Sequence, residues 1–592
     1  MDRQSAQNYI DRIYASEDPS VAYKTHRPIT DLKDMLVSSA EMFGDNVAFM
    51  QRYQKSEPFK KITYKEMYED VKCIGTALID LGLKDERIAI VGDNGVEWAT
   101  AYLAIMTGVG ICVPLDKELK IESILGLMRN ADVKAVFYTK KFSEPFRKIK
   151  EQGGYLPPYL INMQAQEDDD LSFSRSSLIE RGRVLLESGD RRYLDAEIDG
   201  SKMGALIYTS GTTGLAKGVM LSQDNIIADL MSAPNVVEIV DSDIFFSVLP
   251  VHHTYECTSG FLMPLYRGAA IGYCEGLKYI QKNLQEIKPT VFLLVPLLLE
   301  GLYKTIWKNI KKQGKEKTVK RIMQFNRVTS HIGINLNKTF LKSITDVFGG
   351  NLDLIICGGA AINPEILDFF NDIGITTIQG YGLTECAPMA ALNSDQLKYR
   401  RSDSIGRALP NVEIRIDYPD EDGNGEICIK GENVMLGYYN MPEETAEVLK
   451  DGWFYTGDVG YIDEKGFVFL TGRRKNVIIT KNGKNVFPEE IEHYIQKISQ
   501  VEESMVWAAN DEAGHDTKIA ATIRPNMEEL RMAIGDDAED EKKVEEFFKN
   551  EIDKINDELP SFKQIRMIHI RYEEFEKTTS KKIKRFVMEN RY

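Results

Sequence analysis

Cysteine is scarce and scattered in this chain of 592 residues. The seven cysteines are odd in number, and no two of them lie close together in the sequence. This pattern lacks the paired spacing of a disulfide framework and the clustered spacing of a zinc site. We therefore expect reduced cysteines and a cytoplasmic protein.

Long hydrophobic runs are also missing. The longest apolar stretches, around residues 101–115 and 291–299, are too short or too often interrupted by glycine and proline. A membrane-spanning helix needs ~18 apolar residues, so we expect buried helix and strand instead. Residues 1–7 are polar and lack the apolar core of a secretory signal.

Positive charge is in deficit. The chain has 74 Lys and Arg against 90 Asp and Glu, a formal net charge of −16, so no nucleic-acid partner is expected. A hydrophobic content of 43% is that of a globular protein, and the length predicts several structural units. The sequence does not fix the oligomeric state, and a homodimer stays open.

Helical stretches alternate with short apolar runs from about residue 64 onward. Core strands are expected at 88–92, 134–138, 244–249, 290–295 and 352–357. Such alternation predicts α/β layers with a mostly parallel sheet. The acidic, weakly periodic segment 164–200 is expected to be a surface excursion.

The pattern changes near residue 404. Alternating apolar residues at 412–416, 425–430 and 466–470, with a turn signal at 422–425, predict a β-rich subdomain over about 404–470. An α+β segment of ~115 residues follows, which is within ordinary domain size. We predict a large layered α/β N-terminal domain, 1–474, and a small α+β C-terminal domain, 475–592.

The most informative string is YTSGTTGLAKGVMLS, residues 208–222. An apolar run at 203–208 predicts a buried strand, which ends in a loop of hydroxyl residues and glycines. Glycines allow backbone N–H groups to converge on one anion. The candidate anion ligands are Thr209, Ser210, Gly211, Thr212, Thr213 and Lys217. A polyphosphate fits such a loop, although its spacing is not that of the common P-loop, and a polar surface loop is the alternative.

Two more glycine-rich segments follow expected strands. In QGYGLTE, residues 379–385, Tyr381 can stack on a planar ligand, Thr384 offers a hydroxyl to phosphate, and Glu385 suits Mg²⁺. In CGGAA, residues 357–361, the small residues permit a base to approach. The alternative for both segments is a tight structural turn.

Three later segments are weaker signals. Asp458, in YTGDVG, can accept hydrogen bonds from two ribose hydroxyls or serve as a turn residue. Residues 471–476 are basic, and Pro488 with the acids after it reads as a helix start. The basic string 577–585 is by itself an ordinary solvated face.

Together these strings resemble the acyl-adenylate-forming superfamily from about residue 64 to 585. The resemblance implies a large N-terminal domain, a small mobile lid domain and ATP bound between them. It assigns Thr209–Thr213 and Lys217 to the phosphates, Gly359, Ala360 and Tyr381 to adenine, Thr384 to phosphate, Glu385 to Mg²⁺, Asp458 and Arg473 to ribose, Lys475 to the hinge, and Lys582 to adenylation. Where the family usually has Ser-Gly-Lys, this chain has Ser580-Lys581-Lys582, so Lys581 is a rival.

The segment LPVHHTYE, residues 249–256, resembles the acyl pocket of long-chain fatty acyl-CoA synthetases. The matching residues are His253 and Glu256, and Gly483 matches a residue of the acyl and CoA site. Core packing is the alternative. If the segment is extended, His252 and His253 point to opposite faces, and at most one faces the site.

The resemblance implies an AMP-forming long-chain fatty acyl-CoA synthetase that uses Mg²⁺, ATP and CoA. An acyl carrier protein as acceptor, or another carboxylic acid as substrate, stays open. A non-catalytic protein is disfavoured by Glu385 and Lys582.

Basic residues are concentrated between Tyr303 and Lys342, where the sequence has eleven Lys and Arg residues and one acidic residue, Glu316. They are Lys304, Lys308, Lys311, Lys312, Lys315, Lys317, Lys320, Arg321, Arg327, Lys338 and Lys342. Contact with the anionic inner face of a membrane, at about 1 kcal/mol per basic residue, and a solvated helical excursion are equally favoured.

Overall fold

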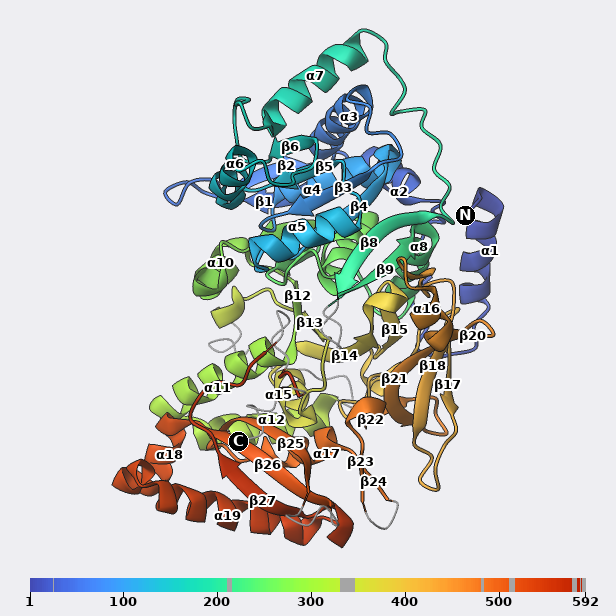
Figure 1. Cartoon of the computed structure of the whole chain (residues 1–592). Helices are drawn as coiled ribbons and strands as arrows, with labels where there is room; N and C mark the ends of the chain where they lie inside the picture. The colour runs from blue at the N-terminus through green and yellow to red at the C-terminus, as the bar shows by residue number, and fades with distance from the viewer. Residues whose placement is uncertain are drawn as a thin grey trace.

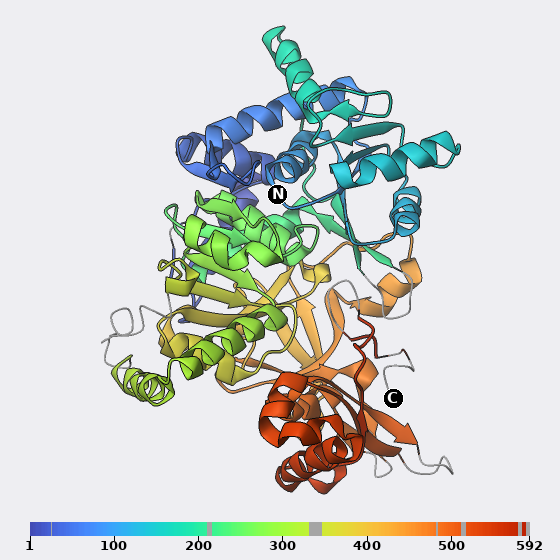
Figure 2. The same ribbon diagram turned by 90° about the vertical axis from the view of Figure 1, so that its left-hand side faces the viewer.

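The computed structural model describes residues 1–24, 26–209, 216–330, 346–480, 484–510, 517–577, 583–585 and 587. The α/β layers, a β-rich unit and the C-terminal α+β unit follow one another along the molecule (Figures 1 and 2). Among the described residues, no helix is both long and apolar enough to cross a membrane. All seven cysteines are free thiols.

One eight-stranded sheet has the order β19-β9-β8-β4-β3-β5-β6-β7. Its strands are β3 (Arg87–Val91), β4 (Ile111–Leu115), β5 (Ala135–Tyr138), β6 (Tyr159–Asn162), β7 (Phe173–Ser174), β8 (Met203–Thr209), β9 (Lys217–Ser222) and β19 (Gly437–Tyr438). Strands β8 and β9 form an antiparallel pair, whereas β3 to β8 pair in parallel. The antiparallel pair β8–β9 therefore lies near one edge of this sheet, next to β19.

A nine-stranded sheet has the order β16-β15-β14-β13-β12-β10-β11-β1-β2. Its strands are β1 (Val47–Gln51), β2 (Lys60–Thr63), β10 (Ile244–Ser247), β11 (Ala270–Tyr273), β12 (Val291–Leu294), β13 (Leu354–Cys357), β14 (Thr376–Gly382), β15 (Met389–Leu392) and β16 (Arg407–Ala408). The central pairs β11–β10–β12–β13–β14 are parallel, so their carboxyl ends meet at one edge. The predicted parallel core is confirmed at all five expected strands.

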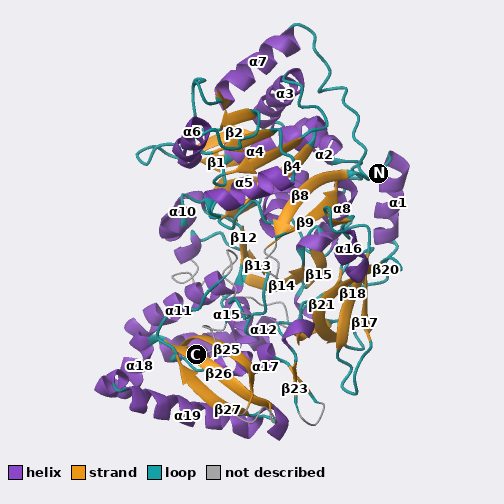
Figure 3. Cartoon of the chain, viewed as in Figure 1, coloured by secondary structure: helices purple, strands orange, loops and turns teal. Residues whose placement is uncertain are grey.

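Helices cover these sheets (Figure 3). They are α1 (Arg3–Tyr14), α2 (Leu32–Met42), α3 (Tyr64–Asp80), α4 (Val96–Ala104), α5 (Ile121–Asn130), α6 (Ser143–Glu151), α7 (Arg175–Glu187), α8 (Gln223–Ser232), α9 (Met263–Arg267), α10 (Ile280–Ile287), α11 (Pro296–Lys312), α12 (Glu316–Ser330), α15 (Pro364–Asp372) and α16 (Pro442–Val448). Capping boxes fix the starts of α3, at Thr63 and Glu66, and of α8, at Ser222 and Asn225.

The expected surface excursion at 164–200 is only partly correct. Helix α7 packs on α3, and Gly182 lies so close to the Cys73 carbonyl that no Cβ would fit. Leu178 and Tyr193 are buried in the core. The acidic composition of the segment did not reveal this packing, because a helix needs only one narrow apolar stripe to pack against a neighbouring helix.

The β-rich unit is a five-stranded antiparallel sheet. Its strands are β17 (Glu413–Asp417), β18 (Gly425–Lys430), β20 (Leu449–Lys450), β21 (Trp453–Ile462) and β22 (Val468–Arg473). The three strands expected from alternation are present, and residues 418–424 connect β17 to β18 as expected.

The C-terminal unit has its own apolar core. A three-stranded sheet of β25 (Val501–Asn510), β26 (Thr517–Pro525) and β27 (Ile565–Ile570) packs with α17 (Pro488–Ile495), α18 (Met527–Ile534) and α19 (Glu541–Glu558). The short pair β23 (Ile478–Ile479) and β24 (Asn485–Val486) precedes it. Pro488 begins α17 as predicted. A boundary at 474/475, with the lid mobile, stays a prediction.

Candidate active site

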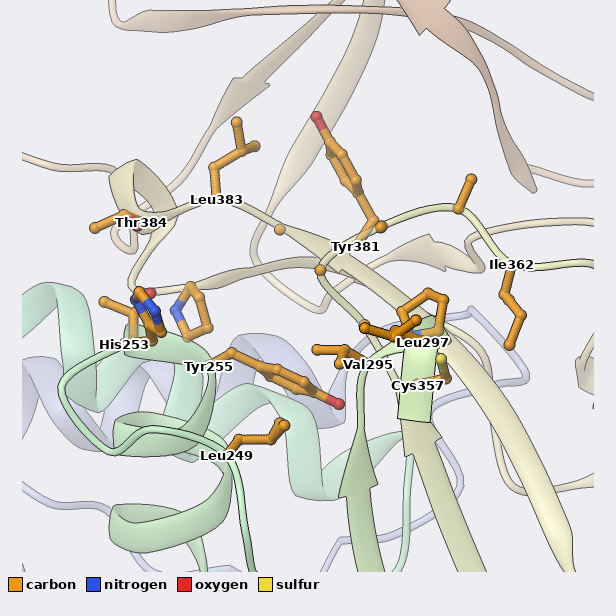
Figure 4. Close-up of a pocket in the computed structure, with 18 of the residues that line it drawn as sticks. Leu249, His253, Tyr255, Val295, Leu297, Cys357, Ile362, Tyr381, Leu383 and Thr384 are labelled. Carbon is orange, nitrogen blue, oxygen red and sulfur yellow. The ribbon is translucent and has the colours of Figure 1, made fainter. Parts of the chain in front are cut away.

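A large cleft, with a volume of about 4190 Å³, runs through the middle of the molecule. Its walls come from the β8–β9 hairpin, the carboxyl ends of β10 and β12–β14, the β21–β22 pair and the C-terminal unit. Loops at the carboxyl ends of parallel strands are where open α/β sheets bind ligands. Figure 4 shows part of this wall, with Tyr381, Thr384, His253 and Tyr255 labelled.

The β8–β9 hairpin places Thr209 and Lys217 side by side. These two residues are a cross-strand pair, and both line the cleft. The expected strand before the loop is present as β8. Ser210, Gly211, Thr212 and Thr213 lie outside the described residues, so their assignment to phosphate stays a prediction.

Tyr438 links Lys217 to Glu385. The Lys217 ammonium lies 4.5 Å from the centre of the Tyr438 ring, and the Tyr438 hydroxyl donates a 2.8 Å hydrogen bond to Glu385 Oε1. Pairing of β19 with β9 fixes this arrangement, because Tyr438 lies opposite Val219. Burial raises the pKa of Tyr438, so the hydroxyl stays a donor.

Thr384 and Glu385 lie on a short 3₁₀ turn directly after β14. The backbone N–H of Met435 donates to the Glu385 carbonyl at 2.8 Å, which ties this turn to the segment before β19. Within the described part of the chain, no group of three His, Cys, Asp or Glu side chains could hold a metal. A single half-buried carboxylate fits Mg²⁺ that takes its other ligands from substrate phosphates and water.

The loop after β13 is open toward the cleft. Gly359 has φ +85°, a conformation that favours glycine, and a Cβ built there would meet only Val295 Cγ1, at 3.7 Å. Gly359 and Ala360 are both exposed and both line the cleft. A flat ring therefore has space against this backbone.

Tyr381, Asp458 and Arg473 form a connected group. The Tyr381 hydroxyl donates to Asp458 Oδ2 at 2.7 Å, and Arg473 Nε lies 2.8 Å from Asp458 Oδ1. Asp458 is 5% exposed, and register places it opposite Arg473 in the β21–β22 pair. Each carboxylate oxygen retains acceptor capacity, so ribose hydroxyls can still bind there.

Lys475 lies between residues that are anchored to different parts of the molecule. Before it, Arg474 pairs with Glu426 of β18 at 2.6 Å. After it, Asn476 Nδ2 donates to Glu489 of α17 at 2.5 Å. A backbone rotation at Lys475 would thus move one anchored body relative to the other, as a hinge requires.

Two predicted residues cannot be placed. Lys582 and Gly483 lie outside the described residues, as does the rival Lys581. Lys577 and Ile583, which flank the lysine pair, form an antiparallel bridge and line the cleft.

The condition under which the two histidines would point to opposite faces, an extended segment, is not met. Pro250 begins a turn, and the π-helical segment η4 (Tyr255–Leu262) follows, so the segment is not extended. The His252 and His253 rings are 4.1 Å apart, and both line the cleft. Glu256 also lines it but is 1% exposed, and its Oε1 accepts a 2.6 Å hydrogen bond from Ser247 Oγ.

A family model described as AMP-binding enzyme matches residues 36–439, which is more than half of the chain. The chain belongs to the AMP-binding enzyme family. It is an AMP-forming ligase of the acyl-adenylate kind, as the resemblance implied.

This AMP-binding enzyme has curated relatives along most of its length. Long chain acyl-CoA synthetase 4 of Arabidopsis thaliana is 28% identical over 579 residues, covering 91% of this chain and 86% of the relative. A chloroplastic long-chain-fatty-acid–[acyl-carrier-protein] ligase, AEE15 of Arabidopsis thaliana, is 27% identical over 581 residues, covering 84% and 76%.

A solved structure, that of the anthranilate CoA ligase AuaEII in complex with anthranoyl-AMP, superposes with a TM-score of 0.73. The match covers 94% of this chain and 96% of that one at 18% identity. At this identity the likeness shows the fold alone, and it is the expected α/β fold.

Two residues of the AMP-binding enzyme were missed by the sequence analysis. Tyr438 follows a glycine near the end of the large region, and that Gly-Tyr-Tyr string was the available signal. Tyr255 donates a 2.8 Å hydrogen bond to the Ile356 carbonyl and is labelled in Figure 4. Both contacts join segments more than fifty residues apart, so local pattern could not reveal them.

Proposed function

We propose that this ligase activates a long-chain fatty acid with ATP and transfers the acyl group to CoA. The observation that carries the proposal is the lining of the cleft. The lining includes Lys217, Glu385 and Asp458, which suit a nucleotide, and also many buried apolar side chains, which suit an alkyl chain.

In the first step, a carboxylate oxygen of the acid would attack the α-phosphorus of ATP, and pyrophosphate would leave. Both reactants are anions, so catalysis needs fixed positive charge and donors at the developing charge. Lys217, Thr209 and Thr384 are the described donors at the phosphate side of the cleft. Lys582 is our proposed further cation, carried by the C-terminal unit.

Glu385 would hold Mg²⁺, with Tyr438 fixing the carboxylate orientation through Oε1. The ion, when bound, would neutralise phosphate charge and assist the departure of pyrophosphate. Asp458, held by Tyr381 and Arg473, would hold the ribose, and the Gly359–Ala360 backbone would face the adenine.

In the second step, the CoA thiol would attack the acyl carbonyl, forming the thioester and expelling AMP. Movement of the C-terminal unit about Lys475 would admit CoA after adenylation. Before that movement the cleft must be closed to water, because water would hydrolyse acyl-AMP.

A second acceptor is supported by one observation. The acyl carrier protein ligase relative matches the chain about as well as the acyl-CoA synthetase relative does. An acyl carrier protein delivers the same thiol, on phosphopantetheine, to the same carbonyl. The cleft geometry does not favour either acceptor.

The test is AMP release from ATP, Mg²⁺ and straight-chain acids of graded length. CoA and a phosphopantetheinylated acyl carrier protein are supplied in separate reactions. We expect the largest kcat/KM with long chains, and a strong dependence on CoA. Release supported by the carrier protein alone would favour the second acceptor. Release only with short or aromatic acids would contradict the fatty-acid proposal.

A further inference from the structure

The segment that carries Glu385 contains a strained residue. Glu385 belongs to a 3₁₀ turn, and Ala387 follows this turn with φ +64°. Residues other than glycine seldom adopt this left-handed conformation, which persists only where surrounding contacts hold it. We call residues 384–389 the Glu385 turn. Its strained residue lies two positions from the proposed Mg²⁺ ligand, so the contacts that hold Ala387 also affect that ligand.

Two side chains from distant segments hold the backbone of the Glu385 turn. Thr258, on η4, donates a 2.8 Å hydrogen bond to the Ala387 carbonyl. Asp229, on α8, accepts a 2.8 Å hydrogen bond from the Met389 N–H through Oδ2. These contacts join residues that are 129 and 160 positions apart in the sequence, so only the folded chain brings them together.

Asn433 provides two further contacts. Its Nδ2 donates to the Cys386 carbonyl at 3.3 Å and to the Met389 carbonyl at 2.5 Å. The backbone on either side of Asn433 is held in turn, because Asn225 Nδ2 of α8 donates to the two flanking carbonyl groups at 2.7 and 2.8 Å. Helix α8 therefore supports both Asp229 and Asn433.

These three side chains stand behind the site and do not reach the cleft. Thr258, Asp229 and Asn433 are 2%, 1% and 1% exposed, and none of them is among the described residues that line the cleft. Thr384 and Glu385 do line it. Buried polar side chains are costly unless they are hydrogen-bonded, and packing alone would be served by apolar residues. The contacts with the Glu385 turn therefore indicate a role in holding its backbone.

We propose that Thr258, Asp229 and Asn433 are positioning residues that hold the strained Glu385 turn in the geometry that Mg²⁺ binding requires. Mg²⁺ demands near-ideal octahedral geometry, so a small displacement of its carboxylate ligand weakens its binding. The Tyr438 hydroxyl orients the Glu385 side chain, whereas these three residues fix the backbone that carries it. This inference rests on the proposed Mg²⁺ role of Glu385.

Thr258→Val tests the inference, because it keeps the shape of the side chain but cannot donate to the Ala387 carbonyl. We expect the Mg²⁺ concentration for half-maximal acid-dependent ATP–pyrophosphate exchange to rise about 5-fold or more, the scale of one lost buried hydrogen bond. A second readout needs no turnover. The rise in Tm that Mg²⁺ causes in the presence of ATP, without acid, should shrink. Thr258→Ser keeps the hydroxyl and should restore both readouts.

Two substitutions of Asp229 separate hydrogen bonding from charge. Burial raises the pKa of the Asp229 carboxyl well above its usual range, so this side chain is neutral in the folded enzyme. Asp229→Asn keeps a neutral acceptor for the Met389 N–H and should leave both readouts nearly unchanged. Asp229→Leu removes the acceptor and should act like Thr258→Val, as should Asn433→Leu.

Ser232→Ala is the matched control. Ser232 lies on α8, is 1% exposed and donates a 2.8 Å hydrogen bond to the Pro410 carbonyl, outside the Glu385 turn. The substitution thus removes a buried hydrogen bond between distant segments without touching the turn. It should lower the Tm of the ligand-free enzyme and leave both Mg²⁺ readouts unchanged.

The outcomes separate a positioning role from a packing role. If Thr258→Val leaves both Mg²⁺ readouts as they are in Ser232→Ala, the inference is wrong. Equal effects of Thr258→Val and Thr258→Ser also contradict it. Should a Leu variant fail to fold, the two Thr258 variants decide the question.

The second readout also separates this inference from the proposed function. If no fatty acid supports exchange, fatty-acid activation fails, while the effect of Mg²⁺ on Tm still decides the inference. If Mg²⁺ does not change the Tm of the unsubstituted enzyme with ATP, the Mg²⁺ role of Glu385 fails, and the inference fails with it.

Discussion

The Tyr438 hydroxyl donates a 2.8 Å hydrogen bond to Glu385 Oε1, while the face of the same ring lies 4.5 Å from the Lys217 ammonium. One aromatic side chain thus positions the proposed Mg²⁺ ligand and a proposed phosphate ligand together. The three residues come from β19, β9 and the turn after β14, which meet only in the folded chain. This relationship makes Tyr438 a positioning residue that substitution can test.

Tyr438→Phe keeps the ring over Lys217 but removes the donor to Glu385. We expect acid-dependent ATP–pyrophosphate exchange to fall about 10-fold, the scale of one hydrogen bond to a charged group. The Mg²⁺ concentration for half-maximal rate should rise as well. Tyr439→Phe is the control, because Tyr439 does not line the cleft. Equal effects in both variants would make Tyr438 a packing residue.

Glu385→Gln removes the carboxylate charge but keeps the side-chain shape. Because Mg²⁺ prefers anionic oxygen, we expect a higher Mg²⁺ requirement and slower adenylation than in Tyr438→Phe. The measurement is the exchange rate as a function of Mg²⁺ at constant MgATP. An unchanged Mg²⁺ dependence would leave Glu385 with a structural role alone.

Lys582→Ala should lower acid-dependent ATP–pyrophosphate exchange by about 10²-fold or more, the scale of one preorganised contact at developing charge. Thioester formation from supplied acyl-AMP should be much less affected, because that step follows adenylation. Lys581→Ala is the matched variant. If it gives the larger defect, the catalytic lysine is Lys581.

Glu256 should make the stability of the enzyme depend on pH. Burial raises its pKa from 4.5 to about 8, so the native state keeps a proton that the unfolded chain releases between these values. Stability should therefore fall as pH rises through that range, by up to about 1.4 kcal/mol per pH unit. The stability of the Glu256→Gln variant should lack this pH dependence.

The measurement is the difference in Tm between the two proteins from pH 5.5 to 8.5. Other groups titrate in both proteins and cancel in the difference. The advantage of the unsubstituted enzyme should shrink as pH rises. A constant difference would show that the Glu256 carboxyl is ionised in the native state.

The basic segment can be tested on vesicles. Ile306, Ile310 and Val319 of α11 and α12 are buried in the core, whereas Leu297 and Phe325 of the same helices are exposed together with the basic side chains. Lys308 pairs with Glu528 of α18 at 2.5 Å. Co-sedimentation with anionic vesicles should thus weaken steeply between 0.1 M and 1 M salt, as the Debye length falls from about 10 Å to about 3 Å.

Replacing Lys311, Lys312, Lys315 and Lys317 with Gln should abolish this binding and leave activity on a soluble shorter acid unchanged. All four side chains are exposed. Neutral vesicles should bind poorly. If sedimentation depends neither on the salt concentration nor on the four substitutions, the segment is a solvated surface that does not bind lipid.

The local sequence pattern was sufficient to predict the strands, but it was not sufficient to predict contacts between distant segments. The run 203–208 predicted β8, and small residues after β13 predicted an open loop, because both depend on neighbouring residues. The sequence left open whether the segment with the two histidines is extended, because local pattern does not reveal the turn at Pro250 and the π-helical segment that bend it. Tyr438 was missed because its role follows from the β19–β9 register, which joins residues far apart.

The central claim is that a fatty acyl-adenylate forms, and oxygen labelling tests it most directly. The acid is supplied with ¹⁸O in its carboxylate, together with ATP, Mg²⁺ and CoA. If the carboxylate attacks the α-phosphorus and the thiol later expels AMP, one ¹⁸O atom remains in the AMP phosphate, which mass spectrometry detects. Label found in inorganic phosphate, or AMP free of label, would contradict the account.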